Sequence, residues 1–502
     1  MNISFKNENI INIVQKINNK TSLNNYDGEN VNECGIEKDD SDNSDNEEDY
    51  NNSETDNLIE SSCYIIDDTI NNNPLELSNP KFNDNLKYHV ENILYEQLKD
   101  IYDIDIIFSL IENIYTLSYN TYFSNIMPSR SYDSSFIRRI PNVSKMTKKI
   151  NHIRNKPQPE QRTSEWYSFR HELITASNAW KALDTQGCIN SLIYEKCVPS
   201  NTSKFDTLNT TTPFHWGHKY EPLSVMYYEY TYKTLVEDFG CLPHDKYSFL
   251  GASPDGINTD KKSYRYGRML EIKNIVNREI NGIPKKEYWI QMQLQMEVCG
   301  LNECDFLETH FKEYENEEEF INDGTFTKTE TGNLKGIILY FIKDGQYHYE
   351  YSPLHSSKDD FEKWEFDIME KNKSNQWIQN IYWKLEKVSC VLVLRNKFWF
   401  KNCIDKFKNI WQTIEYERKN GYEHRAPVKR EKKKIQPIVD NKPNKCLLNV
   451  KQLSNVECDP NRNVSIPDAQ IDKFKKIRTE SFDDVEKNKE EILNIVMKKV
   501  FD

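Results

Sequence analysis

Helical spacing of apolar residues marks several parts of this 502-residue chain. Between residues 85 and 123, apolar positions recur three or four apart, which is the spacing of one face of an α-helix. The same amphipathic pattern covers residues 361–387 and 398–418. We therefore expect two helices in a small accessory region early in the chain and two long helices in its second half.

Short apolar runs between these helices predict β-strands. One run leads into a Gly-Ala-Ser-Pro-Asp-Gly turn at residues 251–256, and a second occupies residues 269–275. A helix is predicted for residues 288–300, because its apolar face ends at a glycine that favours helix termination. Further strands are expected at residues 304–309, 336–342 and 388–394.

Polar stretches divide the chain. The first 80 residues are rich in Asn, Asp, Glu and Ser, and we expect them to be mostly disordered because they cannot bury enough apolar surface to offset the entropy of ordering. The expected organisation is an acidic Asn-rich tail, a small helical accessory region, a basic linker, a central domain, and a basic linker with a C-terminal helical tail: residues 1–80, 81–127, 128–160, 161–420 and 421–502.

The net charge of −13 does not exclude a nucleic-acid partner. Residues 37–60 hold eleven acidic residues and one lysine, so this segment accounts for −10 of the total. The segment 128–160 is basic, which suits contact with phosphates, although its charge fits a solvated linker equally well. Net charge therefore describes the tail and not the rest of the surface.

Cysteine usage and hydropathy indicate in which cellular compartment the protein is expected. The 11 cysteines include no Cys-x-x-Cys pair, so we expect reduced thiols and no zinc or iron–sulfur site. No apolar run approaches the about 18 residues of a membrane span, and no leader with a charged and then an apolar segment opens the sequence. We expect a soluble intracellular protein without a membrane partner.

The central stretch carries the candidate chemistry. Asp255 follows one predicted strand, and Glu271 and Lys273 lie two residues apart on the next. Residues two apart on a strand project from the same face, which leaves their apolar neighbours for the core. Glu221 lies upstream, at or near a predicted helix start. Three acids and a lysine in this order suit divalent-metal-assisted cleavage of a phosphodiester.

The expected metal ion is Mg²⁺, with Mn²⁺ as a possible substitute. Asp255, Glu271 and the main-chain carbonyl of Ile272 are its predicted ligands, because hard cations prefer oxygen donors. Glu221 completes the ligand set or holds a second ion. The alternative is structural, since Asp-Gly is a common turn pair and a carboxylate at a helix start is favoured by the helix dipole alone.

Lys273 and a glutamine complete the predicted catalytic set. Lys273 would orient the attacking water or neutralise charge that builds on the phosphate. Gln291 or Gln293 would position Lys273 or the water, and their spacing leaves the choice open.

Basic and hydroxyl residues upstream form a candidate DNA-binding group. Arg170 precedes an Ile-Thr-Ala-Ser block in which Thr175 or Ser177 would cap a following helix. A helix start with hydroxyls and a nearby arginine can hold a phosphate, although an ordinary cap is the default interpretation. Arg162 lies close by in the sequence and joins the same group.

These motifs together resemble a known family. Ser-Pro-Asp followed by Glu-Ile-Lys is similar to the core of PD-(D/E)XK nucleases. Arg170 with its Thr-Ala-Ser block, the Trp-Gly…Glu-Pro run that contains Glu221, and the Tyr288 segment with its glutamines resemble more narrowly the lambda exonuclease-like, YqaJ-type viral recombinases. The resemblance covers roughly residues 160–310.

The resemblance implies a fold and an activity. The fold would be α/β, a restriction-endonuclease-like core with a central mixed β-sheet flanked by helices, plus helical additions at both ends. The activity would be Mg²⁺-dependent 5′-to-3′ exonuclease digestion of double-stranded DNA in recombination, repair or end processing. The partners would be double-stranded DNA, a single-strand annealing recombinase and further copies of the chain, in the host cytoplasm or nucleus if the protein is viral.

Two other functions compete with this one. A structure-specific or nicking endonuclease could use the same core, and it would open a closed circle whereas an exonuclease would not. A catalytically inactive DNA-binding scaffold is the other alternative. The complete set of Asp255, Glu221, Glu271 and Lys273 argues against it.

Overall fold

A computed structural model describes residues 45–137, 140–199 and 212–427. The segment 428–502, with its expected basic run and terminal helix, lies outside these residues, as does the part of the acidic tail before residue 45. Within the described residues no helix is long and apolar enough to cross a membrane.

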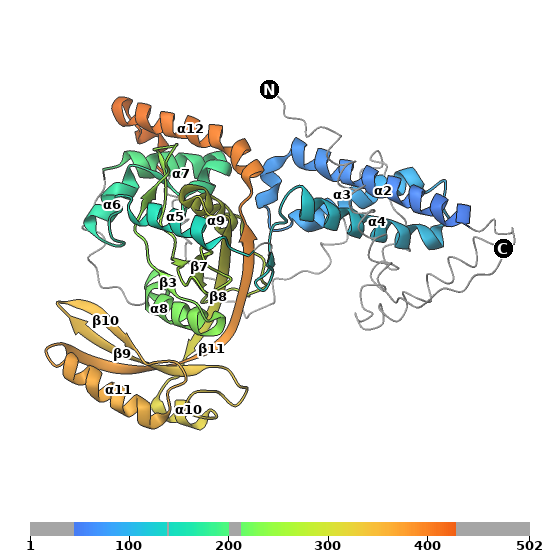
Figure 1. Cartoon of the computed structure of the whole chain (residues 1–502). Helices are drawn as coiled ribbons and strands as arrows, with labels where there is room; N and C mark the ends of the chain where they lie inside the picture. Colours follow the sequence, from blue (N-terminus) through green and yellow to red (C-terminus); the bar gives the residue numbers. More distant parts are fainter. Residues whose placement is uncertain (1–44, 138–139, 200–211, 428–502) are drawn as a thin grey trace, which may run out of the picture. The chain divides into compact units, whose positions relative to one another are not determined.

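A mixed eight-stranded β-sheet forms the centre of the protein (Figure 1). Its order is β10-β9-β11-β8-β7-β6-β3, with β1 paired to β11. The β7–β8 pair is parallel and the other pairs are antiparallel. The strands are β1 Tyr132–Asp133, β3 Val236–Glu237, β6 Gly256–Asn258, β7 Met269–Asn274, β8 Glu303–Glu313, β9 Lys335–Lys343, β10 Gln346–Tyr351 and β11 Gln376–Leu394.

Among the described residues after 140, a smaller sheet and eight α-helices accompany this sheet. The small sheet has the order β2-β5-β4, with β2 Ile174–Thr175, β5 Leu250–Ala252 and β4 Leu242–Pro243. The helices are α5 Val143–Arg154, α6 Ser164–His171, α7 Gln186–Cys197, α8 Pro213–Tyr232, α9 Lys286–Cys299, α10 Glu317–Asn322, α11 Lys358–Lys371 and α12 Lys397–Asn420. This α/β architecture, a mixed sheet flanked by helices, confirms the expected fold class.

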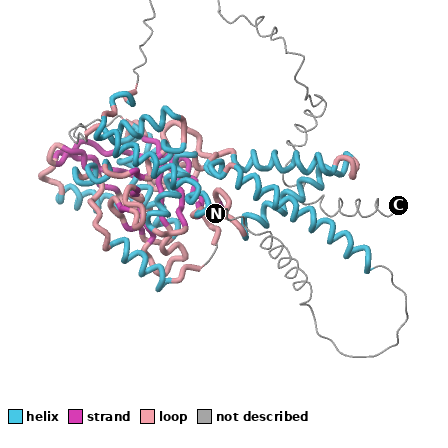
Figure 2. The backbone as a smooth tube through the Cα atoms, turned by 90° about the horizontal axis from the view of Figure 1, so that it is seen from above, coloured by secondary structure: helices cyan, strands magenta, loops and turns pink. Residues whose placement is uncertain are grey.

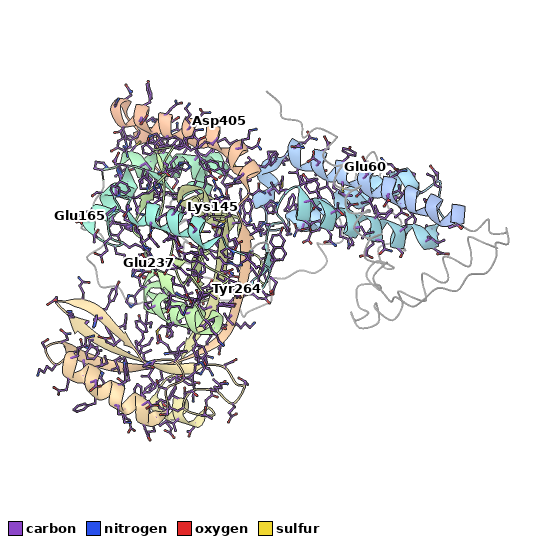
Figure 3. The ribbon with its side chains drawn as sticks, in the orientation of Figure 1. Glu60, Lys145, Glu165, Glu237, Tyr264 and Asp405 are labelled. Carbon is purple, nitrogen blue, oxygen red and sulfur yellow. The ribbon has the colours of Figure 1, made fainter. Side chains whose placement is uncertain are left out.

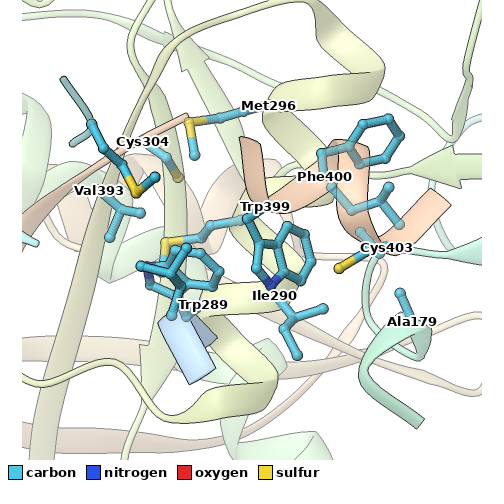
Figure 4. Close-up of a cluster of buried hydrophobic side chains, with 14 of the residues drawn as sticks. Ala179, Trp289, Ile290, Met296, Cys304, Val393, Trp399, Phe400 and Cys403 are labelled. Carbon is cyan, nitrogen blue, oxygen red and sulfur yellow. The ribbon is translucent and has the colours of Figure 1, made fainter. Parts of the chain in front are cut away.

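Helices α9 and α12 build the core on one side of the sheet (Figure 4). Trp289 and Trp399 meet edge to face, with ring centroids 5.2 Å apart, and both are almost fully buried. Met296 and Cys304 are fully buried in the same cluster. This packing fixes α9 against β8, which determines the direction in which each glutamine of α9 points.

An all-helical unit precedes the sheet (Figure 2). It consists of α2 Asp45–Asn72, α3 Phe82–Leu98 and α4 Ile104–Asn125. Helices α3 and α4 confirm the two predicted accessory helices. Helix α2 corrects the prediction of a tail that is disordered to residue 80, because Cys63, Ile66 and Ile70 recur at helical spacing and are buried against the other two helices.

Two further expectations are wrong. The basic linker at 128–160 contains helix α5, and Arg130 is 3% exposed with its guanidinium donating to the carbonyl of Ser78 at 3.2 Å. The predicted helix over 361–387 ends as α11 at Lys371, and its second half belongs to strand β11. Burial alternates at residues 381–385 of that strand, which is the two-residue period of a strand. A short apolar run can satisfy this period and the helical period at once.

Candidate active site

The turn between β5 and β6 places Asp255 against β7. The backbone N–H of Ile272 donates to Oδ2 of Asp255 at 2.7 Å, which holds the carboxylate at the middle of the neighbouring strand. Asp255 is partly exposed to the pocket described below. The Asp-Gly turn has a common turn sequence, but its contact with β7 holds the carboxylate of Asp255 close to the charged residues of that strand, Glu271 and Lys273.

Strand β7 presents Glu271 and Lys273 on one face, as their spacing predicts. The ammonium group of Lys273 contacts Oε1 of Glu271 directly. Glu271 is fully buried, whereas the side chain of Lys273 is 22% exposed. The intervening Ile272 packs in an apolar cluster on the other face, so the alternation of core and charge is confirmed.

Helix α8 supplies the third acid. Glu221 lies in the middle of α8 and not at its start, so the expected helix-dipole contact does not apply. Its Oε2 accepts from Nη2 of Arg162 at 2.8 Å. Arg162 itself adopts a φ of 70°, in the left-handed region that is costly for a residue with a side chain. Glu221 and Asp255 line the same pocket, so the structure brings these predicted residues together.

The acids of this group act on one another. Burial and the neighbouring Glu271 raise the pKa of Asp255 well above its usual range. Burial also raises the pKa of Glu221, against the opposing effects of Arg162 and Lys273. Burial alone would lower the pKa of Lys273, but the carboxylates around it outweigh burial and raise it. The site therefore concentrates negative charge around one ammonium group.

The glutamines of α9 differ in role. Gln293 is 1% exposed, donates to the carbonyl of Leu394 at 2.9 Å and accepts from the N–H of Asn396 at 2.7 Å. These contacts hold α9 to the start of α12, so the prediction of Gln293 as a catalytic residue is corrected. Gln291 lines the pocket with Lys273.

Gln295 is a site residue that the sequence interpretation missed. Its Nε2 donates to Oε2 of Glu271 at 2.7 Å and to the carbonyl of Ser253 at 3.3 Å. Residues four apart lie on one face of a helix, whereas residues two apart point about 200° away from each other. The spacing from Gln291 was therefore the available signal for choosing Gln295 over Gln293.

All four predicted DNA-binding residues line the same pocket as Asp255, and one of them, Arg162, is the partner of Glu221. Arg170 donates through Nη2 to Oγ of Ser177 at 2.8 Å and through Nη1 to Oγ of Ser253 at 3.5 Å. Its guanidinium lies 4.2 Å from the ring centroid of Trp166. Thr175 is 1% exposed within β2. The predicted capping role is wrong for Thr175 and Ser177, since the next helical turn, Ala179–Leu183, begins after Asn178.

Lys196 is a second residue that the sequence interpretation missed, and the sequence carries no signal for it. It is 4% exposed at the end of α7, and its Nζ donates to the carbonyl of Arg170 at 2.8 Å. Burial lowers its pKa to about 8. Lys196 thus adds a cation to the wall formed by Arg170 and Ser177.

A pocket of about 950 Å³ joins the two groups. Glu221, Asp255 and Lys273 line it together with Arg170 and Ser177. Among the described residues, no group of three His, Cys, Asp or Glu side chains is arranged to hold a metal ion. This result agrees with the contacts above, because Glu271 is paired with Lys273 and Glu221 with Arg162.

Comparison with known proteins identifies the segment that contains this pocket. Residues 165–302 match the model of the YqaJ-like viral recombinase domain. This segment resembles a YqaJ-like viral recombinase domain. The resemblance expected from the motifs is therefore confirmed, and the matched segment holds Arg170, Glu221, Asp255, Glu271 and Lys273.

More distant similarities extend beyond this domain. An uncharacterized protein of Acanthamoeba polyphaga mimivirus is 29% identical over 329 residues, which cover 58% of this chain and 57% of that protein. The chain thus spans little more than half the length of this relative. Two crystal structures of LHK-Exo, an alkaline exonuclease from Laribacter hongkongensis, are each 18% identical in sequence to this chain, and each match covers 95% of the LHK-Exo chain. They cover 51% and 52% of this chain, with TM-scores of 0.30 and 0.28.

Proposed function

We propose that this protein is a divalent-metal-dependent deoxyribonuclease that degrades double-stranded DNA from its 5′ ends. The observation that carries the proposal is the convergence of Glu221 and Asp255, which line the pocket, and the buried Glu271 on Lys273. Structural ion clusters usually balance acids with cations, whereas here three acids face two cations, Lys273 and Arg162. The match to a viral recombinase domain supports a role on DNA ends.

The donor set fits a hard divalent cation such as Mg²⁺, with Mn²⁺ as a substitute. Carboxylates that raise one another's pKa are stabilised in their charged form by a nearby cation. Asp255, Glu271 and the carbonyl of Ile272 would hold the ion, and Glu221 would join them on release from Arg162. When bound, the ion would polarise the scissile phosphate and activate a water molecule.

The chain's own side chains position the reactants. Gln295 holds Oε2 of Glu271, which fixes the direction of the carboxylate. Lys273 remains charged because of its acidic neighbours, and its partial exposure lets the ammonium face a phosphate oxygen in the pocket. Gln291 lines the pocket beside Lys273, where its amide would orient water.

Arg170 and the hydroxyl groups beside it would bind the 5′ end of the DNA. Arg170, Ser177 and Ser253 already form a connected set of donors, and Arg170 is held flat against Trp166. A guanidinium with two hydroxyls suits a terminal phosphate, because charge-assisted hydrogen bonds are stronger than neutral ones. Thr175 supports Ser177 from the strand, with the two hydroxyl oxygens 3.4 Å apart. A single-strand annealing recombinase and further copies of this chain are the partners that such a domain would use.

One assay tests the activity. Purified protein is incubated with 5′-labelled linear duplex and with closed circular DNA, in Mg²⁺, in Mn²⁺ and in EDTA. We expect the linear duplex to be degraded with metal only and the circle to stay closed; an opened circle would instead identify an endonuclease. Lys273→Ala should slow digestion about a hundredfold or more, since it removes the charge at the phosphate.

Lys262→Ala is the matched control. Lys262 is an exposed lysine in the loop between β6 and β7, outside the pocket. The Lys262→Ala variant should digest DNA at the wild-type rate. Equal rates for all three proteins, or equal rates with EDTA, would refute the proposed function.

A further inference from the structure

A second pocket lies at the other end of β7 from the candidate active site. Its volume is about 590 Å³, and its walls come from the segment after α4, from α5 and from the start of α12. Arg268, which directly precedes β7, lines this pocket, whereas Lys273 lines the first one. Five residues of extended strand span about 17 Å, so the two pockets are separate.

The walls of this second pocket are basic. They carry five cations and one acid: Lys145, Lys149, Arg268, Arg395, Lys397 and Glu303. The two arginines are already neutralised, Arg268 by Glu303 at 3.0 Å and Arg395 by Glu297 at 2.6 Å. Within the described part of the chain, the three lysines form no ion pair with an acid. Three positive charges are therefore left without a counter-charge.

These lysines come close enough to repel one another. Burial lowers the pKa of Lys149, and Arg395, Lys145 and Lys397 lower it further. Lys145 and Lys149 are four residues apart on α5, a spacing at which like charges destabilise a helix (Figure 3 labels Lys145). Such an arrangement costs stability unless an anion binds between the charges.

Apolar side chains line the same pocket as the lysines. Tyr266 is 3% exposed and its hydroxyl lies 2.8 Å from Oγ1 of Thr147, which fixes the ring. Met146 and the partly exposed Phe398 line the same pocket. A ligand that combines an anionic group with a flat or apolar part matches both walls.

We propose that this pocket binds a nucleotide phosphate, from a mononucleotide or from a nucleic-acid strand, between the lysines of α5 and α12. The sugar or base would lie against Tyr266 and Phe398. The proposal rests on the proposed nuclease function for its choice of ligand, since a nuclease handles strands and releases nucleotides. The pocket takes no part in bond cleavage, and it gives the basic segment before residue 160 a defined role.

Lysine labelling of the full chain tests the site without turnover. The protein is treated in EDTA with an amine-reactive acetylating reagent, alone, with dAMP, or with a short single-stranded oligonucleotide. Mass spectrometry then follows Lys145, Lys149 and Lys397. We expect severalfold slower labelling of these residues with at least one of the two probes. The exposed Lys148 and Lys408, on the same two helices but outside the pocket, should label at an unchanged rate.

Charge removal provides the second arm. Lys145→Ala with Lys397→Ala should lower the slope of log affinity for the oligonucleotide against log salt by about 1.4, because two phosphate contacts are lost. The pair Lys148→Ala with Lys408→Ala removes the same charge and should leave the slope within experimental error. Both pairs should digest linear duplex in Mg²⁺ as the wild type does.

The outcomes separate the two proposals. Equal protection of pocket and control lysines, no protection by either probe, or equal slopes for the two double variants would overturn the second site. Absence of digestion by every protein, with labelling protection intact, would instead refute the nuclease and leave the second site standing.

Discussion

Two clusters of buried charge lie on opposite faces of the parallel strands β7 and β8, because Asp305 is paired with Leu270 and Glu271 with the next residue, Phe306. At the start of β8, Asp305 is fully buried and accepts from the hydroxyl of Tyr228 at 2.5 Å and from Nη1 of Arg268 at 3.1 Å. Arg265 contacts the same carboxylate. Each oxygen of this acid has a donor, and because Glu303 also pairs with Arg268 the cluster holds two acids and two cations.

The other cluster has an excess of acids. Glu271, Asp255 and Glu221 face two cations, Lys273 and Arg162. The first cluster is balanced within the chain and ties the sheet to its surroundings. The second leaves one acidic charge without a matching cation. The difference indicates how a structural ion network can be told from a site: by whether the charges are satisfied internally.

The largest expected effect lies in the structural cluster. Asp305→Ala leaves the buried Arg265 without a carboxylate and Arg268 with Glu303 alone, so the free energy of unfolding should fall by about 3–5 kcal/mol. Urea denaturation measures this change. Asp405→Ala, at an exposed position of α12, should stay within about 0.5 kcal/mol of the wild type. The comparison fails if the two variants are equally stable.

The opposite behaviour is expected at Asp255. Asp255→Asn should slow digestion about a hundredfold or more, because it removes a proposed metal ligand. It should not lower stability in metal-free buffer at neutral pH. The folded state raises the pKa of this carboxyl, so wild-type stability falls as pH rises past the unfolded pKa of about 4, and the asparagine lacks this dependence.

Thermal unfolding across pH, with and without Mg²⁺, checks the second part of this expectation. Mg²⁺ should raise the Tm of the wild type and leave that of Asp255→Asn nearly unchanged. If the variant is less stable than the wild type at every pH and responds equally to Mg²⁺, Asp255 belongs with the structural cluster.

Smaller effects distinguish the two glutamines of α9. Gln295→Leu removes the donor to Glu271 and should reduce the digestion rate about tenfold or more, as loss of an orienting partner does at metal sites. Gln293→Leu leaves the buried carbonyl of Leu394 and the N–H of Asn396 unpaired. It should lower the free energy of unfolding by about 1–3 kcal/mol without changing the rate per folded molecule. A reversed pattern would restore Gln293 to the site.

The sequence predicted the charged side of the site better than its surroundings. Glu271 and Lys273 share a face of β7 because side-chain direction in a strand alternates strictly, so spacing alone sufficed. Gln293 was a misassignment of helix phase, which the spacing from Gln291 could have prevented. Lys196 had no local signal, since its burial arises from the packing of α7 near Arg170.

The errors in the fold also have physical causes. Helix α2 was obscured by the many Asn and Asp residues between its buried positions, although Cys63, Ile66 and Ile70 already had helical spacing. Strand β11 was taken for a helix over much of its length, because a short apolar run satisfies both periods. In both cases partners distant in the sequence decide the structure: α4 for the helix, and β8 with β9 for the strand.

The smallest expected effect concerns Lys196 and pH. Burial lowers the pKa of this lysine to about 8, so its amine is mostly charged at pH 7 and mostly neutral at pH 9. If the wall beside Arg170 binds a 5′-phosphate, the preference for 5′-phosphorylated over 5′-hydroxyl duplex should weaken severalfold between these pH values. Arg170 keeps its charge over this range, so the remaining preference should be independent of pH. Lys196→Met should show that lower, flat preference throughout. Initial digestion rates of the two duplexes give the ratio at each pH, which cancels any general effect of pH on the metal or on bond cleavage. If the preference for 5′-phosphorylated duplex falls equally between pH 7 and pH 9 in Lys196→Met, a group other than Lys196 is titrating.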